Sequence, residues 1–178
     1  MDHGTQGTVP GITDTTYFSA INKGTINVGV TPSNSNGGTV GVHIDSQQSS
    51  FANEGQIFIG RGPQFDPGDT PADVSINQGT ITAGIYLPDG GTAVNTGNIT
   101  ISKEAQNAAG IYSDSENSLI NNAAGSEIIV LGNASNVDAP NMNYGIFIKD
   151  TGASSSITNN GLINLQGVNA AGIRAFCY

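Results

Sequence analysis

Acidic and histidine side chains come close together at two places in the sequence. Asp66, Asp69 and Asp73 lie within eight residues of one another, and three carboxylates can attract a hard cation such as Ca²⁺. The stretch lacks EF-hand spacing and has no further acidic ligand, so we predict a solvated loop and no bound metal. His43 precedes Asp45 by two residues, which places both side chains on one face of a strand. No Gly-x-Ser-x-Gly nucleophile elbow accompanies this pair, so we predict no hydrolytic triad.

Charge and composition exclude several classes of protein. The 178 residues include 5 basic and 14 acidic ones, and the formal net charge of −9 would repel a nucleic-acid backbone. The apolar share of 37% is too high for a disordered acidic tail, and no stretch approaches the roughly 18 apolar residues of a membrane helix. Cys177 is the single cysteine, so neither a disulfide framework nor a cysteine metal site is predicted.

Two short motifs recur along the chain. Asn-Ala-Ala-Gly-Ile occurs unchanged at residues 107–111 and 169–173. Pairs of Gly-Ile or Gly-Val begin at Gly11, Gly41, Gly84, Gly110, Gly145 and Gly172. The motif Asn-x-Gly-x-Ile begins at Asn22, Asn53, Asn77, Asn95 and Asn159, with a stretched copy at Asn121.

The spacing of these motifs predicts the fold. The step from a Gly-Ile pair to the next motif asparagine is 11 to 14 residues, whereas the return step varies from 7 to 24. A stacked coil behaves this way when one side keeps its register and insertions leave from one corner. We therefore predict an all-β, right-handed parallel β-helix of about seven coils, with residues 1–10 as a leader and residues 11–178 as one domain that is a fragment of a longer protein. Insertions are expected at Thr31–Val40, Gly60–Pro71, Lys103–Ala108 and Leu131–Asn143.

Short apolar segments supply the expected strands. Residues 26–28, 57–59, 99–101 and 163–165 alternate apolar residues with polar or aromatic ones, which is the period of a strand with one buried face. Gly84–Leu87 and Gly145–Ile148 are expected to be strands that begin at a corner glycine. The residues directly before the motif asparagines are expected to stack as a core column that contains Ile21, Ala52, Ile76, Val94 and Ile120.

Stacking also explains why asparagine and aspartate recur. An Asn amide repeated at one corner can bond the Asn of the next coil, and we predict such a ladder at Asn22, Asn53, Asn77, Asn95, Asn121 and Asn159. The alternative is that each Asn only marks a turn. Aspartates follow the Gly-Ile strands at Asp14, Asp45, Asp89, Asp114 and Asp150. Turns at an exposed corner are favoured over a calcium-binding row, because the offsets of these aspartates drift by two residues.

Aromatic residues are the main candidates for a binding surface. Tyr86 and Tyr112 follow Gly-Ile at equivalent positions, and His43 and Phe147 occupy the same place in their repeats. If this row faces outward, it can stack on sugars or on a partner protein; if it faces inward, it belongs to the core. Both readings stay open at this point. Further candidate contact residues lie in the insertions: Phe65, Met142 and Tyr144.

Some β-helical proteins cleave polysaccharides, so an enzyme is the main alternative to a binding protein. Glycosidic cleavage needs two carboxylates at a fixed separation, and no such pair recurs on one strand face of this sequence. Lyases of this fold rely on arginine, and the only arginines, Arg61 and Arg174, lie far apart in the chain. We therefore predict no catalytic residue and no cofactor.

The repeats resemble the passenger domains of Gram-negative autotransporters that have a pertactin-like β-helix. The resemblance rests on Asn-x-Gly-x-Ile followed by a variable gap and then Ala-Gly-Ile-Tyr, and it runs from about Gly11 to Phe176. It implies a location outside the cell, at the bacterial surface, with export through a C-terminal outer-membrane β-barrel that this sequence does not contain. It also implies an adhesin that binds a host receptor, matrix protein or glycan, or that self-associates. A purely structural stalk of a secreted toxin or protease is the remaining alternative.

Overall fold

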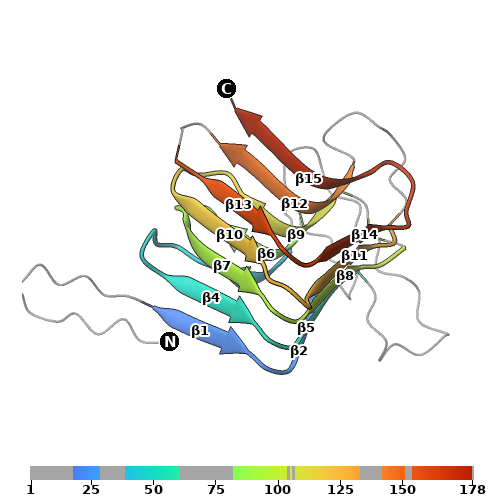
Figure 1. Ribbon diagram of the computed structural model, residues 1–178, viewed down its shortest axis with the longest axis horizontal. Coiled ribbons are helices and arrows are strands. Elements are labelled where there is room, and N and C mark those ends of the chain that lie inside the picture. Colours follow the sequence, from blue (N-terminus) through green and yellow to red (C-terminus); the bar gives the residue numbers. More distant parts are fainter. Residues whose placement is uncertain are drawn as a thin grey trace, which may run out of the picture.

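The computed structural model describes residues 18–28, 39–60, 82–103, 105, 107–132, 142–150 and 154–177, without the side chains of Asp150 and Cys177. Fifteen strands and no helix occur in this part of the chain. The strands form three parallel sheets of five strands each (Figure 1). The predicted all-β parallel β-helix is therefore confirmed.

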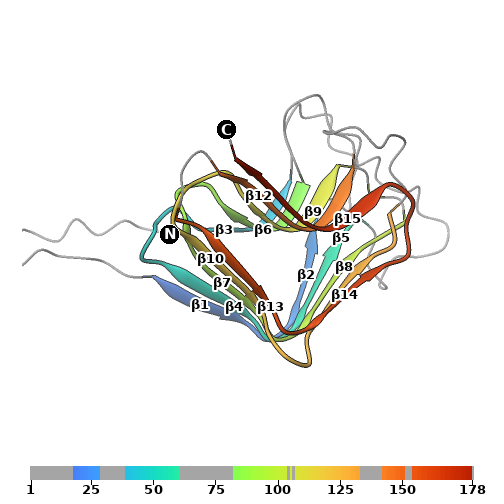
Figure 2. The ribbon, with the colours of Figure 1, turned by 45° about the horizontal axis from the view of Figure 1, so that its top comes forward.

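The three sheets wind around a common core, which Figure 2 shows enclosed on three sides. Sheet A contains β1 (Ser19–Asn22), β4 (Ser50–Asn53), β7 (Gly91–Asn95), β10 (Ser118–Asn122) and β13 (Ser156–Asn159). Sheet B contains β2 (Thr25–Val28), β5 (Gln56–Ile59), β8 (Asn98–Ile101), β11 (Glu127–Val130) and β14 (Leu162–Leu165). Sheet C contains β3 (Val40–His43), β6 (Thr82–Leu87), β9 (Ala108–Ser113), β12 (Asn143–Asp150) and β15 (Ala170–Cys177).

One strand from each sheet makes a rung, so the described residues form five rungs rather than about seven coils. Asn77 lies outside the described residues, and β4 pairs directly with β7, so that Asn53 lies beside Asn95. The expected leader, residues 1–10, also lies outside the described residues.

Insertions leave the β-helix at one corner, as the spacing predicts. The connection from sheet A to sheet B has two residues in four rungs and four residues, 123–126, in the other. The connection from sheet B to sheet C ranges from four residues, 166–169, to 22 residues, 60–81. The A–B corner therefore keeps the register, while the B–C corner accepts chain of different lengths.

Sheet B carries the most regular part of the core. Ile26, Ile57, Ile99, Ile128 and Ile163 pair in register from rung to rung. The three central members of this column are completely buried, and each contributes about 1.5–3 kcal/mol of burial free energy. The four segments predicted from their alternation are thus confirmed as strands with one inward face.

The glycines of the described Gly-Ile and Gly-Val pairs lie inside the strands of sheet C and not at their beginnings; Gly11 lies outside the described residues. Strand β6 begins two residues before Gly84, and β12 begins two residues before Gly145. A Cβ atom on Gly84 would lie 2.7 Å from the carbonyl oxygen of Gly110 and 3.1 Å from methyl groups of Ile57 and Ile59. Only glycine lets the chain approach the core and the next rung this closely.

The repeated Asn-Ala-Ala-Gly-Ile sequence has a structural explanation at the start of β9 and β15. Asn107 and Asn169 have φ angles of 51° and 55°, a left-handed conformation that Asn tolerates better than most residues. The isoleucine of the first copy, Ile111, is completely buried. The pentapeptide therefore specifies a corner residue, a close approach and a core side chain in one unit.

The expected core column directly before the asparagines is wrong for three of its members, whereas Ile120 is buried in the core as predicted and Ile76 lies outside the described residues. Ile21 is 54% exposed, and the residues that pair with it in register, Ala52 and then Val94, are only half-buried. Because the asparagines point inward, the period of two turns the preceding residue outward. The inward column lies one residue earlier and consists of Ala20, Phe51, Ala93, Ile120 and Ile157.

An asparagine ladder runs along the A–B corner. The Nδ2 atom of each ladder residue donates to Oδ1 of the next at 2.8 Å. The ladder consists of Asn22, Asn53, Asn95, Asn122 and Asn159. The predicted ladder is confirmed for Asn22, Asn53, Asn95 and Asn159. The prediction is wrong for Asn121, whose place Asn122 takes, and Asn77 lies outside the described residues.

The fourth rung places Asn122, not Asn121, in the ladder, because its A–B connection is two residues longer. Ser126, which is buried in that connection, donates its hydroxyl to Asn122 Oδ1 at 2.7 Å. Asn121 instead pairs with Val94 in the outward column, and its Oδ1 is buried without a hydrogen-bond partner.

These two neighbouring asparagines provide a stability test. Asn122→Ala removes bonds to Asn95, Asn159 and Ser126, so we expect a loss of about 2 kcal/mol or more in the free energy of unfolding. Asn121→Ala removes an unsatisfied acceptor, so we expect a change within about 0.5 kcal/mol or a gain. Urea unfolding followed by circular dichroism measures both. Equal losses of unfolding free energy in the two variants would contradict the conclusion that the ladder hydrogen bonds of Asn122 stabilise the fold.

Candidate binding surface on sheet C

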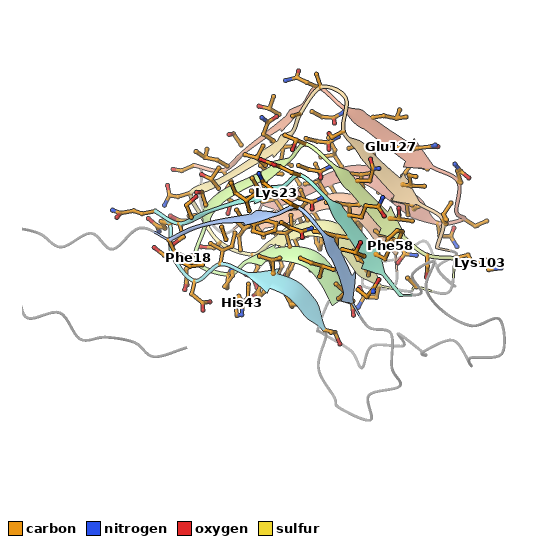
Figure 3. The ribbon with its side chains drawn as sticks, turned by 90° about the horizontal axis from the view of Figure 1, so that it is seen from below. Phe18, Lys23, His43, Phe58, Lys103 and Glu127 are labelled. Atoms are coloured by element: carbon orange, nitrogen blue, oxygen red, sulfur yellow. The ribbon has the colours of Figure 1, made fainter. Side chains whose placement is uncertain are left out.

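The aromatic row predicted from the Gly-Ile repeats lies on the outer face of sheet C. His43, Tyr86, Tyr112 and Phe147 pair in register across β3, β6, β9 and β12. Figure 3 labels His43 on the first of these strands. Ile85 and Leu87, on either side of Tyr86, are completely buried, whereas Tyr86 is not. The row therefore faces outward, and the inward alternative is excluded.

The four rings follow one another along the axis of the β-helix: His43, Tyr86 and Tyr112 are stacked, and the ring of Phe147 is tilted by 34° against that of Tyr112. The centroid distances are 5.1 Å for His43–Tyr86, 5.2 Å for Tyr86–Tyr112 and 5.4 Å for Tyr112–Phe147. These distances follow the spacing of about 4.7–4.9 Å between neighbouring strands, so the backbone register itself brings the rings together. Both faces of Tyr86 and Tyr112 are therefore covered by neighbouring rings. A sugar cannot lie flat on these two tyrosines, and the row presents ring edges and hydroxyl groups instead.

Arg174 continues the row on the fifth rung. It pairs with Phe147 in register, and its Cζ lies 5.6 Å from the ring centroids of Phe147, Tyr144 and Phe176. Such positions favour a cation over an aromatic face. The sequence analysis did not include Arg174 in the row, although it follows Gly-Ile at the same offset as Tyr86.

Tyr144, a predicted contact residue, is buried to 99% and supports the row instead. Its ring centroid lies 4.6 Å from that of Phe147, and its hydroxyl accepts a hydrogen bond of 3.0 Å from Arg174. Met142, directly before β12, is half-buried. The third predicted contact residue of the insertions, Phe65, lies outside the described residues.

Carboxylates border the row at the ends of the sheet C strands. The Tyr86 hydroxyl donates to both carboxylate oxygens of Asp114, at 2.9 and 3.0 Å. His43 Nε2 lies 2.9 Å from Asp45 Oδ1, as their spacing predicts, and Asp89 is exposed nearby. Two of the recurring aspartates thus contact ring side chains of the row, a role that the sequence analysis did not assign to them.

The environment of the row keeps its two phenols protonated. Burial, followed by the hydrogen bond and charge of Asp114, raises the pKa of Tyr86 above its usual value, and the charges of Asp89 and Asp45 add to this. Burial and the charge of Asp114 raise the pKa of Tyr112 in the same direction. The two hydroxyls therefore stay neutral hydrogen-bonding groups in the acidic border throughout the physiological pH range.

The acidic stretch from Asp66 to Asp73, for which we predict a solvated loop, lies outside the described residues, and so does Asp14 of the recurring aspartates. Within the described ranges, no group of three or more His, Cys, Asp or Glu side chains could hold a metal ion. Those ranges also contain no helix that is long and apolar enough to cross a membrane.

Comparison of the chain with protein-family models, with curated proteins and with solved structures found no match.

The raised tyrosine pKa values predict how stability changes at alkaline pH. Above about pH 10 the unfolded chain releases phenolic protons that the folded chain retains. The tyrosines therefore contribute fully to the free energy of unfolding below pH 10, and this contribution falls as the pH rises further. We expect Tyr86→Phe to reduce this fall, at a cost of about 1 kcal/mol at pH 7 for the lost bond to Asp114. Urea unfolding of both proteins between pH 7 and 11.5 measures the difference. An equally large fall in Tyr86→Phe would contradict the raised pKa of Tyr86 as a cause of the loss of stability at alkaline pH.

Proposed function

We propose that this chain is a non-catalytic, β-helical binding segment of a bacterial surface adhesin of the autotransporter passenger type. Its contact surface is the outer face of sheet C. The observation that carries this proposal is the outward row of stacked rings bordered by carboxylates. A side chain repeated at one position along a rod presents the same group once per rung, so many weak contacts to an extended partner add together.

The chemistry of the surface limits the partner. At the first three rungs, the hydroxyls of Tyr86 and Tyr112 and the carboxylates of Asp45, Asp89 and Asp114 offer mainly hydrogen-bond acceptors and negative charge. Arg174 adds a positive charge at the fifth rung. Such a surface favours a partner that is rich in hydrogen-bond donors or positive charge, and it disfavours acidic glycans and nucleic acids. A matrix protein, a receptor with a basic patch or a neutral glycan fits this description.

A polysaccharide-cleaving enzyme is less consistent with the same residues. The two side chains of the His43–Asp45 pair are 52% and 70% exposed, whereas catalytic groups of this kind depend on shielding from water. The carboxylates of sheet C accompany ring side chains and do not face one another across a cleft in the described residues. A structural stalk would need neither the rings nor the carboxylates at the surface.

A binding screen against matrix proteins and neutral and acidic glycans tests the proposal. We expect binding without turnover, and we expect the double variant Asp45→Asn, Asp89→Asn to bind about tenfold more weakly. This loss corresponds to about 1.4 kcal/mol, within reach of the loss of one charge-assisted hydrogen bond. Added salt should weaken binding if the partner is basic.

Glu54→Gln combined with Glu127→Gln on sheet B also removes two negative charges and supplies the control for net charge. Glu54 belongs to the A–B corner, where it pairs with Lys23 at 3.6 Å, and this control should bind like the parent. Equal losses in the control and in the double variant would locate binding elsewhere. Release of reducing or unsaturated sugar from a polysaccharide would overturn the non-catalytic reading, and binding that survives the double variant unchanged would overturn the choice of surface.

A further inference from the structure

The outer face of sheet C changes the sign of its charge between the third and the fourth rung. A second outward row lies two residues after the aromatic row, and it contains Asp45 on the first rung and Asp114 on the third. Lys149 takes this place on the fourth rung, because it directly follows Ile148, which pairs with Ser113, the residue before Asp114. The aromatic row itself ends on the fifth rung with Arg174. The face is therefore acidic over the first three rungs and basic over the last two.

Two cations and two phenylalanines make up the basic part, which we name the basic end: Phe147, Lys149, Arg174 and Phe176. Figure 1 shows their strands, β12 and β15, side by side. Lys149 is exposed and pairs in register with Phe176, whereas Arg174 pairs with Phe147, two residues before Lys149. A spacing of about 4.8 Å between strands and a rise of about 3.3 Å per residue place the Cα atoms of Lys149 and Arg174 about 8 Å apart. Two long side chains at this separation can reach the same anionic group.

Neither cation of the basic end forms an ion pair with a carboxylate among the described side chains. The carboxylate at the neighbouring position, Asp114, accepts the Tyr86 hydroxyl with both of its oxygens, at 2.9 and 3.0 Å, and is thereby held toward the second rung instead of Lys149. Arg174 donates to the hydroxyl of Tyr144 at 3.0 Å, and a guanidinium has four more N–H donors. In a chain with a net charge of −9, this end of sheet C thus offers positive charge to an acidic group of another molecule.

We propose that Lys149 and Arg174 bind carboxylate side chains of an extended peptide segment whose basic side chains contact Asp45, Asp89 and Asp114. The inference rests on the proposed function, because it names the partner of the same face of sheet C. The planar guanidinium of Arg174 matches a carboxylate with two parallel N–H groups. Its Cζ lies 5.6 Å from the ring centroids of Phe147 and Phe176, and such contacts hold a guanidinium in a fixed orientation.

The spacing of the charges favours a peptide over an acidic glycan. Asp45 belongs to the first rung and Arg174 to the fifth, so about 19 Å of the axis separates their positions. Side chains on one face of an extended peptide follow one another about every 6.7 Å. Two basic side chains followed by two acidic ones on that face therefore span about 20 Å and meet the opposite charge at each place. A polyuronate carries carboxylates along its whole length and would bring like charge against Asp45 and Asp114.

Fluorescence anisotropy of two labelled, capped peptides with the 178-residue chain tests the proposal at about 0.05 M NaCl, where screening is weak. The blocked peptide is Lys-Thr-Lys-Thr-Glu-Thr-Glu, and the interleaved peptide, Lys-Thr-Glu-Thr-Lys-Thr-Glu, has the same composition and net charge. We expect the parent chain to bind the blocked peptide about fivefold more tightly, because the interleaved order replaces two exposed ion pairs by like-charge contacts.

Variants of the basic end locate this preference. The double variant Lys149→Gln, Arg174→Gln should prefer the blocked peptide only about twofold, because the acidic rungs alone then read the order of the charges. Lys23→Gln, Lys103→Gln removes two positive charges from other parts of the surface and should keep the full preference. Circular dichroism verifies folding, and the single variant Lys149→Gln, at an exposed position, replaces the double variant if the loss of Arg174 unfolds the last rung.

Four outcomes would overturn the proposal. These are no binding of either peptide at about 1 mM, equal binding of the two peptides by the parent, a preference that the basic-end variants keep in full, and a preference that the control variant loses as well. An oligogalacturonate that binds more tightly than the blocked peptide, and that depends on Lys149 and Arg174, would assign the basic end to a glycan and overturn the peptide.

The failure of this inference differs from the failure of the proposed function. A matrix protein or neutral glycan that binds more weakly to Asp45→Asn, Asp89→Asn supports sheet C as the contact surface even where the two peptides bind equally, and only the role of the basic end is then wrong. Binding of a matrix protein that changes neither in Asp45→Asn, Asp89→Asn nor in Lys149→Gln, Arg174→Gln would overturn the contact surface and this inference together.

Discussion

The structure depends on one constraint: equivalent residues of successive rungs must lie directly over one another. The asparagine ladder enforces it at the A–B corner, where each amide of the ladder donates to the next at the same distance of 2.8 Å. Inner members such as Asn95 are completely buried, and each both donates and accepts. A shift of one residue along a strand would therefore leave buried polar groups without partners toward both neighbouring rungs. The isoleucine columns of sheet B reinforce the same register, because a slip of one residue would turn the whole column toward water.

The same constraint builds the surface. Once the backbone stacks in register, a residue type that recurs at one outward position becomes a continuous row. Sheet C turns four aromatic residues into a stack with centroid distances of 5.1–5.4 Å and ends it with Arg174. Sheet A turns ten uncharged residues into a flat face. Different surfaces with different chemistry can thus form on neighbouring sides of one rod, since each sheet repeats its own outward positions independently of the others.

Stacking also changes what a repeated side chain can do. A single exposed tyrosine offers its ring face to a ligand, but Tyr86 and Tyr112 use both faces on their neighbours. Their hydroxyls and the carboxylate of Asp114 become the groups that a partner meets. The corner between sheets B and C lies at the other end of sheet B from the ladder, and it accommodates connections of four to 22 residues. Connections of different lengths therefore occur at the corner where they do not disturb the register of the strands.

The motif spacing by itself determined the parallel β-helix, the ladder, the strands of sheet B and the corner that takes insertions, because these features follow from residue types that recur at fixed local distances. Tertiary structure alone decided between Asn121 and Asn122, since two adjacent asparagines satisfy the same motif and only the longer connection with Ser126 selects one of them. It also decided that Ile21 faces water, that Tyr144 is buried and that the aromatic row faces outward. Each of these depends on which of two alternating faces meets the core, and a strand of four residues fixes that choice only when its neighbours hold it in register.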